Sequence, residues 1–228
     1  MYCLDDNIWL FEGEPVRFMG LPYTTRMTVI RLSDQSLWVH SPIRLTSEIQ
    51  NQIEQLGSVK YLVAPNALHH LFLNDWLSDY PQALLFGTKG VIQKRPDIHF
   101  QHTLTTDFSA FWTTDIELLL FTGSKVMEEA VFFHAESRTL IVTDLIENFS
   151  PKNIPILKRP LAKMAGILAP HGKTPLDWRL TFCRNKDQVR RHIKRISSWN
   201  PKTIVMAHGE IITQDALPFL HRSFAWAN

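Results

Sequence analysis

The sequence has few of the features that mark exported or membrane-spanning proteins. Its two cysteines, Cys3 and Cys183, lie far apart and form no Cys-x-x-Cys pair, so neither a disulfide framework nor a thiolate zinc site is predicted. No apolar run approaches the roughly 20 residues that span a bilayer. Acidic Asp5 and Asp6 stand where a secretion signal carries positive charge. We therefore expect a cytoplasmic protein without a membrane partner.

Strong charge of either sign is also missing. The net charge is only +2, whereas nucleic-acid-binding proteins usually gather Lys and Arg on one face, so no nucleic-acid partner is expected. With 45% hydrophobic and 20% charged residues, the 228-residue chain can bury one sizeable core. It contains no internal repeat, low-complexity tract or clear linker. We expect one domain over residues 1–228 that takes a small-molecule ligand or substrate.

Strands and helices are predicted to alternate along the chain. Runs of β-branched and aromatic residues predict strands at 8–11, 26–32, 36–40, 59–63, 83–86, 116–121, 130–133, 139–143 and from 203 onward. Apolar residues at helical spacing predict helices at 46–57, 71–80 and 185–199, the last with a basic, solvated face. The stretch 150–174 is rich in Pro and Lys and is interpreted as an insertion with a helix at 161–168.

Four candidate metal ligands each follow the end of a predicted strand: His69, His70, Asp144 and His208. Adjacent histidines at a strand exit can both face one pocket. Neutral imidazoles and a carboxylate suit Zn, Fe, Mn or Ni, and strand ends hold ligands rigidly. Gly209 directly after His208 permits a tight turn close to a ligand. Purely structural roles stay open, with the histidine pair capping a helix or exposed and Asp144 capping a turn.

This succession of strand ends resembles a divergent branch of the metallo-β-lactamase superfamily, over nearly the whole chain. In that family two sheets, each covered by helices on its outer face, form a four-layer αβ/βα sandwich, and loops at the sheet edges hold the metals. The resemblance therefore implies an α+β fold of this metallo-β-lactamase-like kind. It also implies a hydrolase-like metal centre.

The family signature His-x-His-x-Asp-His is only half present. Laid on residues 65–70, it places Pro65 and Ala67 at the first two histidines, and neither side chain can bind a metal. It places His69 at the aspartate and His70 at the last histidine. One changed ligand and one matching ligand therefore survive.

At the remaining positions of the family signature, some ligands are again retained and others are lost. Asp144 resembles the metal-bridging aspartate and His208 the final histidine. The family's Gly-His-Thr segment corresponds to 123–129, which contains no histidine, and the register places Lys125 there. The early Asp-x-Gly appears as residues 40–42, with His40 as a supporting residue behind the ligands. The lost ligands all belong to one metal, whereas the retained set matches the other metal and the bridge.

Two classes of function are left open. The first is a mononuclear metal-dependent hydrolase of an ester, thioester, lactone or phosphoester, in which Lys125 replaces the missing positive charge and Glu129 orients water or acts as a base. A bound Zn²⁺ lowers the pKa of its water to about 7 if one coordination position stays open. The second is a catalytically inactive, even metal-free, member that uses the former pocket to bind a small molecule or a protein partner.

Overall fold

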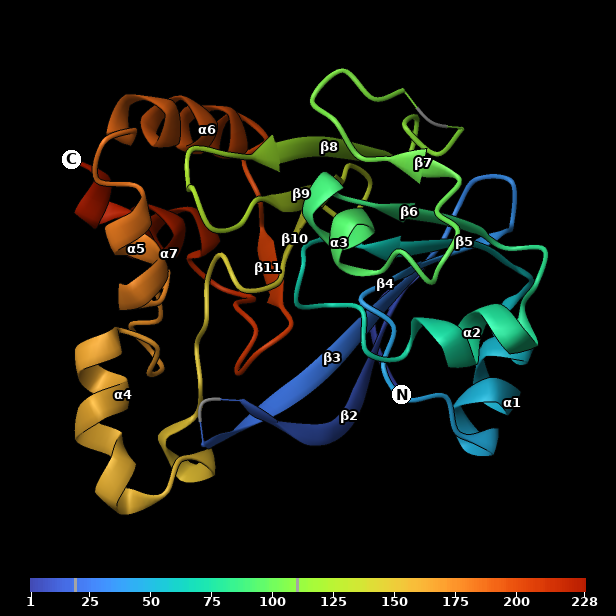
Figure 1. Ribbon diagram of the computed structural model, residues 1–228, viewed down its shortest axis with the longest axis horizontal. Coiled ribbons are helices and arrows are strands. Elements are labelled where there is room, and N and C mark those ends of the chain that lie inside the picture. Colours follow the sequence, from blue (N-terminus) through green and yellow to red (C-terminus); the bar gives the residue numbers. More distant parts are fainter. Residues whose placement is uncertain (19, 110) are drawn as a thin grey trace. The chain divides into compact units, whose positions relative to one another are not determined.

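The computed structural model describes residues 1–18, 20–109 and 111–228, with the backbone alone for residue 21. It divides into two compact units (Figure 1). Unit 1 contains Met1–Pro15 and Thr24–Asp115, and unit 2 contains Val16–Tyr23 and Ile116–Asn228. This division concerns compactness and not independent folding, so the single domain with an insertion near 150–174 stays a prediction.

The first sheet has the strand order β1 to β7 among the described residues. Its strands are β1 (Tyr2–Asp5), β2 (Ile8–Phe18), β3 (Leu21–Arg31), β4 (Leu37–His40), β5 (Val59–Ala64), β6 (Leu84–Gly87) and β7 (His102–Thr103). The turn between β2 and β3 belongs to unit 2. Strands β4 to β7 run parallel, so their carboxyl ends lie at one edge of the sheet. That edge carries the predicted histidine pair.

The helices of unit 1 are α1 (Ser47–Leu56), α2 (Leu73–Asp79) and α3 (Lys89–Lys94). The predicted helix at 46–57 is confirmed in detail: the Thr46 side chain accepts a hydrogen bond from the Ile49 amide at 3.2 Å, and Gly57 ends the helix. The core of this unit includes Trp76, whose indole N–H donates to the Ile43 carbonyl at 2.7 Å. This bond satisfies the one polar group of a fully buried side chain.

The second sheet, in unit 2, has the order β11, β10, β9, β8. Its strands are β8 (Ile116–Phe121), β9 (Glu129–His134), β10 (Thr139–Val142) and β11 (Thr203–Met206). Its helices are α4 (Arg159–Ala165), α5 (Leu176–Thr181), α6 (Lys186–Ser198) and α7 (Ala216–Ser223), with 3₁₀ turns η1 (Pro151–Asn153), η2 (Ile156–Lys158) and η3 (Ala225–Ala227). Strands β10 and β11 pair in parallel, and β8, β9 and β10 pair antiparallel.

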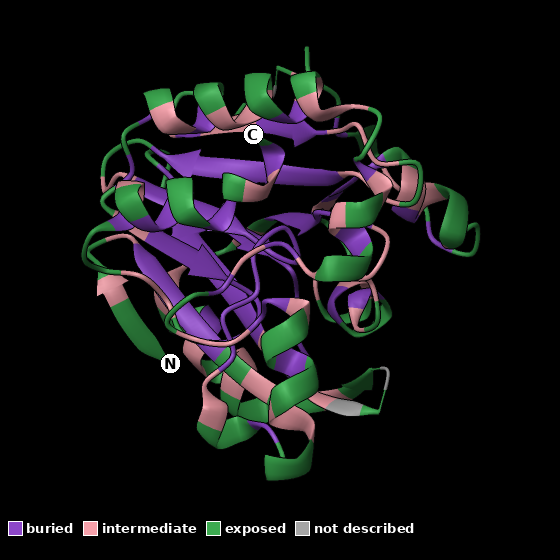
Figure 2. Cartoon of the chain, turned by 90° about the vertical axis from the view of Figure 1, so that its left-hand side faces the viewer, coloured by how far each residue is buried: buried purple, intermediate pink, exposed green. Residues whose placement is uncertain are grey.

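Burial follows the amphipathic patterns of the sequence. The central strands are buried, and the helices keep exposed outer faces (Figure 2). In α6 the buried positions are Val189 and Ile196, which confirms the predicted amphipathic helix. No helix in the described ranges is both long and apolar enough to cross a membrane.

Some elements differ from the predictions. The helix expected at 161–168 is α4, at Arg159–Ala165, because Gly166 adopts a left-handed φ of 81° and its amide bonds back to Ala162 and Lys163. The short elements β1, β7, α3, α5 and α7 were not predicted. They are brief or carry no clear apolar period, so only their packing defines them.

Candidate metal centre

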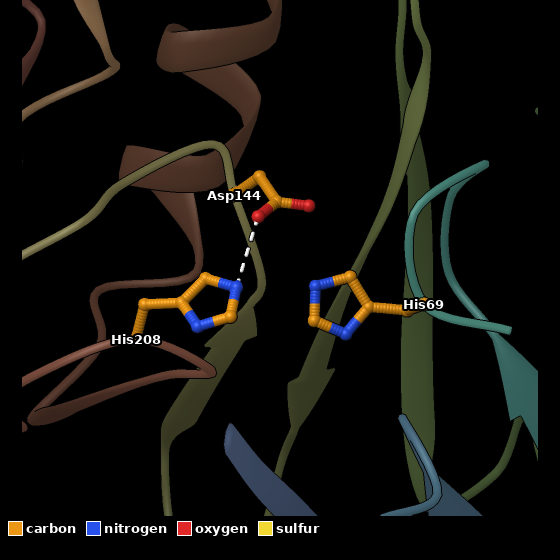
Figure 3. Close-up of side chains that lie close together, drawn as sticks. All are labelled: His69, Asp144 and His208. Atoms are coloured by element: carbon orange, nitrogen blue, oxygen red, sulfur yellow. Dashed lines mark ion pairs between the residues drawn. The ribbon is translucent and has the colours of Figure 1, made fainter. Parts of the chain in front are cut away.

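Asp144 and His208 meet at the carboxyl ends of two neighbouring parallel strands. Val142 of β10 pairs with Met206 of β11, and each candidate ligand lies two residues beyond its strand. The equal offset brings the Asp144 carboxylate oxygen Oδ1 within 3.0 Å of His208 Nε2 (Figure 3). Both side chains are buried. The parallel register therefore joins two residues that are 64 positions apart in the sequence.

The Asp144 loop is held by Glu129, at the start of β9. The Glu129 side chain is fully buried, and its carboxylate accepts hydrogen bonds from the backbone amides of Thr143, Asp144 and Leu145 at 2.8, 2.9 and 3.1 Å. Three amide donors compensate for the loss of water around a buried carboxylate. Because both of its oxygens are used by the loop, Glu129 positions Asp144, and the geometry does not present it as a base.

The His208 loop depends on a close approach between two backbone segments. Gly209 has a φ of 97°, and a Cβ atom there would lie 2.1 Å from the Asn148 carbonyl oxygen. The Asn148 amide donates to the His208 carbonyl at 3.1 Å, and the Asn148 carbonyl accepts from the Glu210 amide at 2.8 Å. Only glycine fits between these segments. The tight turn predicted at Gly209 is confirmed.

A buried acid and a phenol lie next to this pair, and sequence reasoning missed both. The Tyr23 ring lies edge-on to the His208 ring at 5.1 Å between centroids, and its hydroxyl donates to Glu147 Oε2 at 3.4 Å. Burial, reinforced by the charge of Asp144, raises the pKa of Glu147 well above its usual range. Burial and the charge of Glu147 likewise raise the pKa of Tyr23. The sequence signal that could have pointed to Glu147 was its position three residues after the candidate ligand Asp144.

In unit 1, His69 lies on the loop after β5, and hydrogen bonds hold both its backbone and its imidazole ring. The Asn66 side-chain oxygen accepts hydrogen bonds from the Leu68 and His69 amides at 2.8 and 3.3 Å. The His69 ring nitrogen Nδ1 lies 2.6 Å from the Ser41 hydroxyl, which follows β4. A hydroxyl that accepts the Nδ1 proton leaves a lone pair on Nε2, the tautomer that binds a metal.

His70 has a different environment. Arg95 donates to the His70 carbonyl at 2.9 Å, and the same nitrogen lies 3.4 Å from His70 Nδ1. Partial burial and the positive charges of Lys94 and Arg95 lower the pKa of His70. Because a guanidinium can only donate, this contact favours the tautomer in which Nδ1 accepts and Nε2 carries the proton. A ligand role for His70 would therefore require this contact to break.

The other predicted site residues lie as follows. His40, the last residue of β4, is buried and stacks on Trp38 at 5.4 Å between ring centroids. Burial, and next the charge of His69, lower the pKa of His40 well below its usual range, so the imidazole is neutral. Lys125 is exposed on the loop after β8, Pro65 is buried and Ala67 is half-buried.

The candidate ligands and the residues that support them form two half-sites, one in each unit. The unit 1 half-site is His69 with Ser41 and Asn66, and the unit 2 half-site is Asp144 and His208 with Glu129. The unit 2 half-site is compatible with a metal, because ligand atoms at about 2.0–2.2 Å from one ion are roughly 2.8–3.6 Å apart at angles of about 90–110°. The observed separation of 3.0 Å lies in that range. A histidine and a carboxylate are also a common pair of ligands for Zn²⁺ and related ions.

Comparison with solved structures identifies the fold. DIM-1 metallo-beta-lactamase exposed to ceftazidime matches with a TM-score of 0.68 and 15% identity, over 99% of this chain and 94% of that one. A metallo-beta-lactamase from Pontibacter korlensis matches at 0.66 and 12%, over 99% and 96%. A putative diflavin flavoprotein A 5 from Nostoc sp. PCC 7120 matches at 0.65 and 12%, over 97% and 92%. The α+β, metallo-β-lactamase-like fold expected from the sequence is therefore confirmed.

These identities are low, and they show the fold alone. No curated protein matches the sequence. One family model does, and it covers residues 5–177, which is more than half of the chain. The chain thus belongs to the family described as a domain of unknown function, DUF4336.

Proposed function

We propose that this protein binds one divalent transition metal ion through Asp144 and His208, with His69, predicted from the sequence, as the third ligand, and that it hydrolyses an ester, thioester, lactone or phosphoester. The observation that carries the proposal is the buried pairing of Asp144 with His208 at 3.0 Å, at the ends of two parallel strands. Figure 3 shows the three side chains. The donor set suits Zn, Fe, Mn or Ni.

Three protein ligands favour catalysis over a purely structural site. Catalytic zinc sites keep three protein ligands and one open position, whereas structural sites fill all four. His70 is left out of the set because Arg95 engages its Nδ1. When bound, such an ion supplies a hydroxide nucleophile near neutral pH by lowering the pKa of its water.

The chain's own residues then have distinct roles. Glu129 fixes the loop that presents Asp144, and Ser41 fixes the His69 ring so that Nε2 is the binding atom. Tyr23, which keeps its proton, packs against the His208 ring. We propose that Lys125, exposed after β8, supplies the positive charge that a second metal provides in binuclear enzymes.

Metal content tests the first half of the proposal. Tag-free protein is incubated with Zn²⁺, Fe²⁺, Mn²⁺ or Ni²⁺, dialysed, and measured by elemental analysis beside His69→Ala and His208→Ala. The matched controls are His99→Ala in unit 1 and His221→Ala in unit 2, both exposed histidines. We expect about one ion per chain in the parent and controls and strong loss in the two test variants. Parent protein that retains no metal would contradict the proposal.

Activity tests the second half. The metal-loaded protein is assayed with ester, thioester, lactone and phosphodiester substrates beside Asp144→Asn and Lys125→Ala. Turnover that Asp144→Asn abolishes would support the hydrolase. Metal binding without turnover on any substrate would instead favour a protein that uses the site for binding only. The apolar side chains of Pro65 and Ala67, where a second metal's ligands would stand, are the observation that favours this alternative.

A further inference from the structure

Unit 2 carries an exposed row of large apolar side chains on its α4 segment. Turn η2 (Ile156–Lys158) leads directly into α4, and Leu157, Leu161 and Met164 follow one another at intervals of four and three residues. Leu157 lies in the turn before the helix, and Leu161 and Met164, three residues apart, share one face of α4. They are 91%, 60% and 69% exposed, and we call them the apolar stripe. Single exposed apolar residues are ordinary, whereas several aligned on one face mark an interaction surface.

The apolar stripe is not the face that packs against the protein. Ala162, on the same helix, is 1% exposed and packs in a cluster with Ile154 and Ile167. Helix α4 therefore has a buried apolar face and a second, exposed one. The core requires only the buried face to be apolar, so it does not explain the apolar residues on the exposed face.

The adjoining helix α5 extends this surface. Its Leu176 and Leu180 are 40% and 64% exposed and lie four residues apart, on one face. The Arg179 guanidinium donates to the Ala165 carbonyl at 2.9 Å and so ties α5 to the end of α4. Figure 1 shows the two helices one after the other at the left.

The segment that carries the apolar stripe is basic, and the first acidic residue after it is the exposed Asp177 in α5. No Asp or Glu occurs from 148 to 176, whereas five basic residues do, and they are Lys152, Lys158, Arg159, Lys163 and Lys173. Lys152 and Lys163 are exposed. Such a surface combines aliphatic side chains that prefer a hydrocarbon phase with cations that prefer phosphate groups.

We propose that α4 and its preceding turn dock this protein on the surface of a membrane rich in anionic phospholipid. The apolar stripe enters the boundary between headgroups and acyl chains, and the flanking lysines contact lipid phosphates. The helix lies in the plane of the interface and does not cross the bilayer. This departs from our expectation, from the sequence, of a protein without a membrane partner, and it is independent of the proposed metal site.

A bilayer fits this surface better than a second copy of the chain does. In a symmetric dimer the same patch faces itself, which would bring the exposed Lys152 and Lys163 of one subunit against those of the other. Like charges held close together at an interface oppose binding. An anionic lipid surface meets the same residues with the opposite charge.

Vesicle co-sedimentation of the full chain tests the proposal. One set of vesicles is pure phosphatidylcholine, and the other contains about one third phosphatidylserine. The apolar variant is Leu157→Ser with Leu161→Ser, and Met164→Gln is a milder second variant. The charge variant is Lys152→Glu with Lys163→Glu. The matched control is Phe111→Ser, since Phe111 is 84% exposed and belongs to unit 1.

We expect the parent and the control to bind the anionic vesicles and not the neutral ones. The apolar variant should lose at least tenfold in partition, and the charge variant should lose several-fold at low salt. All the altered residues are exposed, so circular dichroism and melting temperature should not change.

Three results would overturn the proposal. One is a parent that fails to sediment with either vesicle, and another is an apolar variant that binds like the control. The third is a parent dimer that the apolar variant dissociates, without vesicle binding, which would assign the surface to a second copy. Binding of an acidic amphipathic peptide in place of vesicles would assign it to a protein partner and would overturn the proposal equally.

Discussion

The two half-sites are built by different means. In unit 2, Asp144 and His208 are buried and their loops are fixed by Glu129, fully inside the protein, and by a backbone contact that requires Gly209. In unit 1, His69 is half-buried and depends on an Asn66 turn and one hydroxyl. Asp144 and His208, the candidate ligands with the more demanding support, are also the two whose residue types agree with the expected metallo-β-lactamase resemblance, whereas His69 stands where that signature has an aspartate. Positions 65 and 67, with Pro and Ala, lie in the less demanding half.

Removal of the Glu129 carboxylate should have the largest effect on stability. Glu129→Ala leaves three buried backbone amides without their acceptor, and we expect a loss of about 3–5 kcal/mol in the free energy of unfolding, measured by urea denaturation. The control is Glu128→Ala, the half-buried neighbour, which should cost less than about 1 kcal/mol. Equal losses in the two variants would show that the carboxylate does not organise the Asp144 loop.

A second test replaces Gly209. Gly209→Ala places a Cβ atom 2.1 Å from the Asn148 carbonyl oxygen and strains a φ of 97°, so we expect a loss of about 2–3 kcal/mol. The control is Gly90→Ala in α3, whose Cβ would lie 3.6 Å from Ala67 Cβ, an ordinary contact. That variant should gain about 0.5–1 kcal/mol, because alanine suits a helix better than glycine. If Gly209→Ala lowers the free energy of unfolding and Gly90→Ala raises it, the loss comes from backbone strain and not from an added methyl group in general.

A third test uses pH, because the buried acid Glu147 belongs to unit 2 alone. Its raised pKa means that the folded protein keeps the proton at a pH where the unfolded chain, with a value near 4.5, has released it. The native state then binds more protons, so this group makes stability fall as pH rises above about 4.5, until the folded pKa is reached. The slope for one proton is about 1.4 kcal/mol per pH unit.

The Glu147→Gln variant has no titratable proton at this position, so the contribution of this group to the pH dependence of stability is lost. We expect the slope of unfolding free energy above pH 4.5, taken from urea titrations with a chelator present, to become less negative, by up to about 1.4 kcal/mol per pH unit while the folded parent keeps this proton. The variant should also be at least as stable as the parent at neutral pH. Superimposable pH profiles would show that Glu147 is ionised in the folded protein.

Sequence patterns pointed to the candidate ligands but not to the residues that hold them in place. Strand ends and Gly209 were readable because apolar runs and turn residues are local signals. The role of Glu129 was not, since its partners are backbone amides whose positions depend on the loop conformation. Arg95 lies 25 residues from His70, so only the folded chain pairs them. A helix was expected at 161–168, near α4, but no local rule shows that one of its apolar faces points outward.

The smallest expected effect lies in unit 1. Asn66→Ala removes the oxygen that accepts the Leu68 and His69 amides, and because these lie on a half-buried loop that water can reach, we expect a loss of about 1 kcal/mol. Asn51→Ala on the exposed face of α1 is the control and should be close to neutral. If Asn66→Ala costs as much as Glu129→Ala, the two half-sites are equally demanding. If it costs little but weakens metal binding by about tenfold, then Asn66 orients His69 more than it stabilises the fold, as supporting residues around metal ligands do.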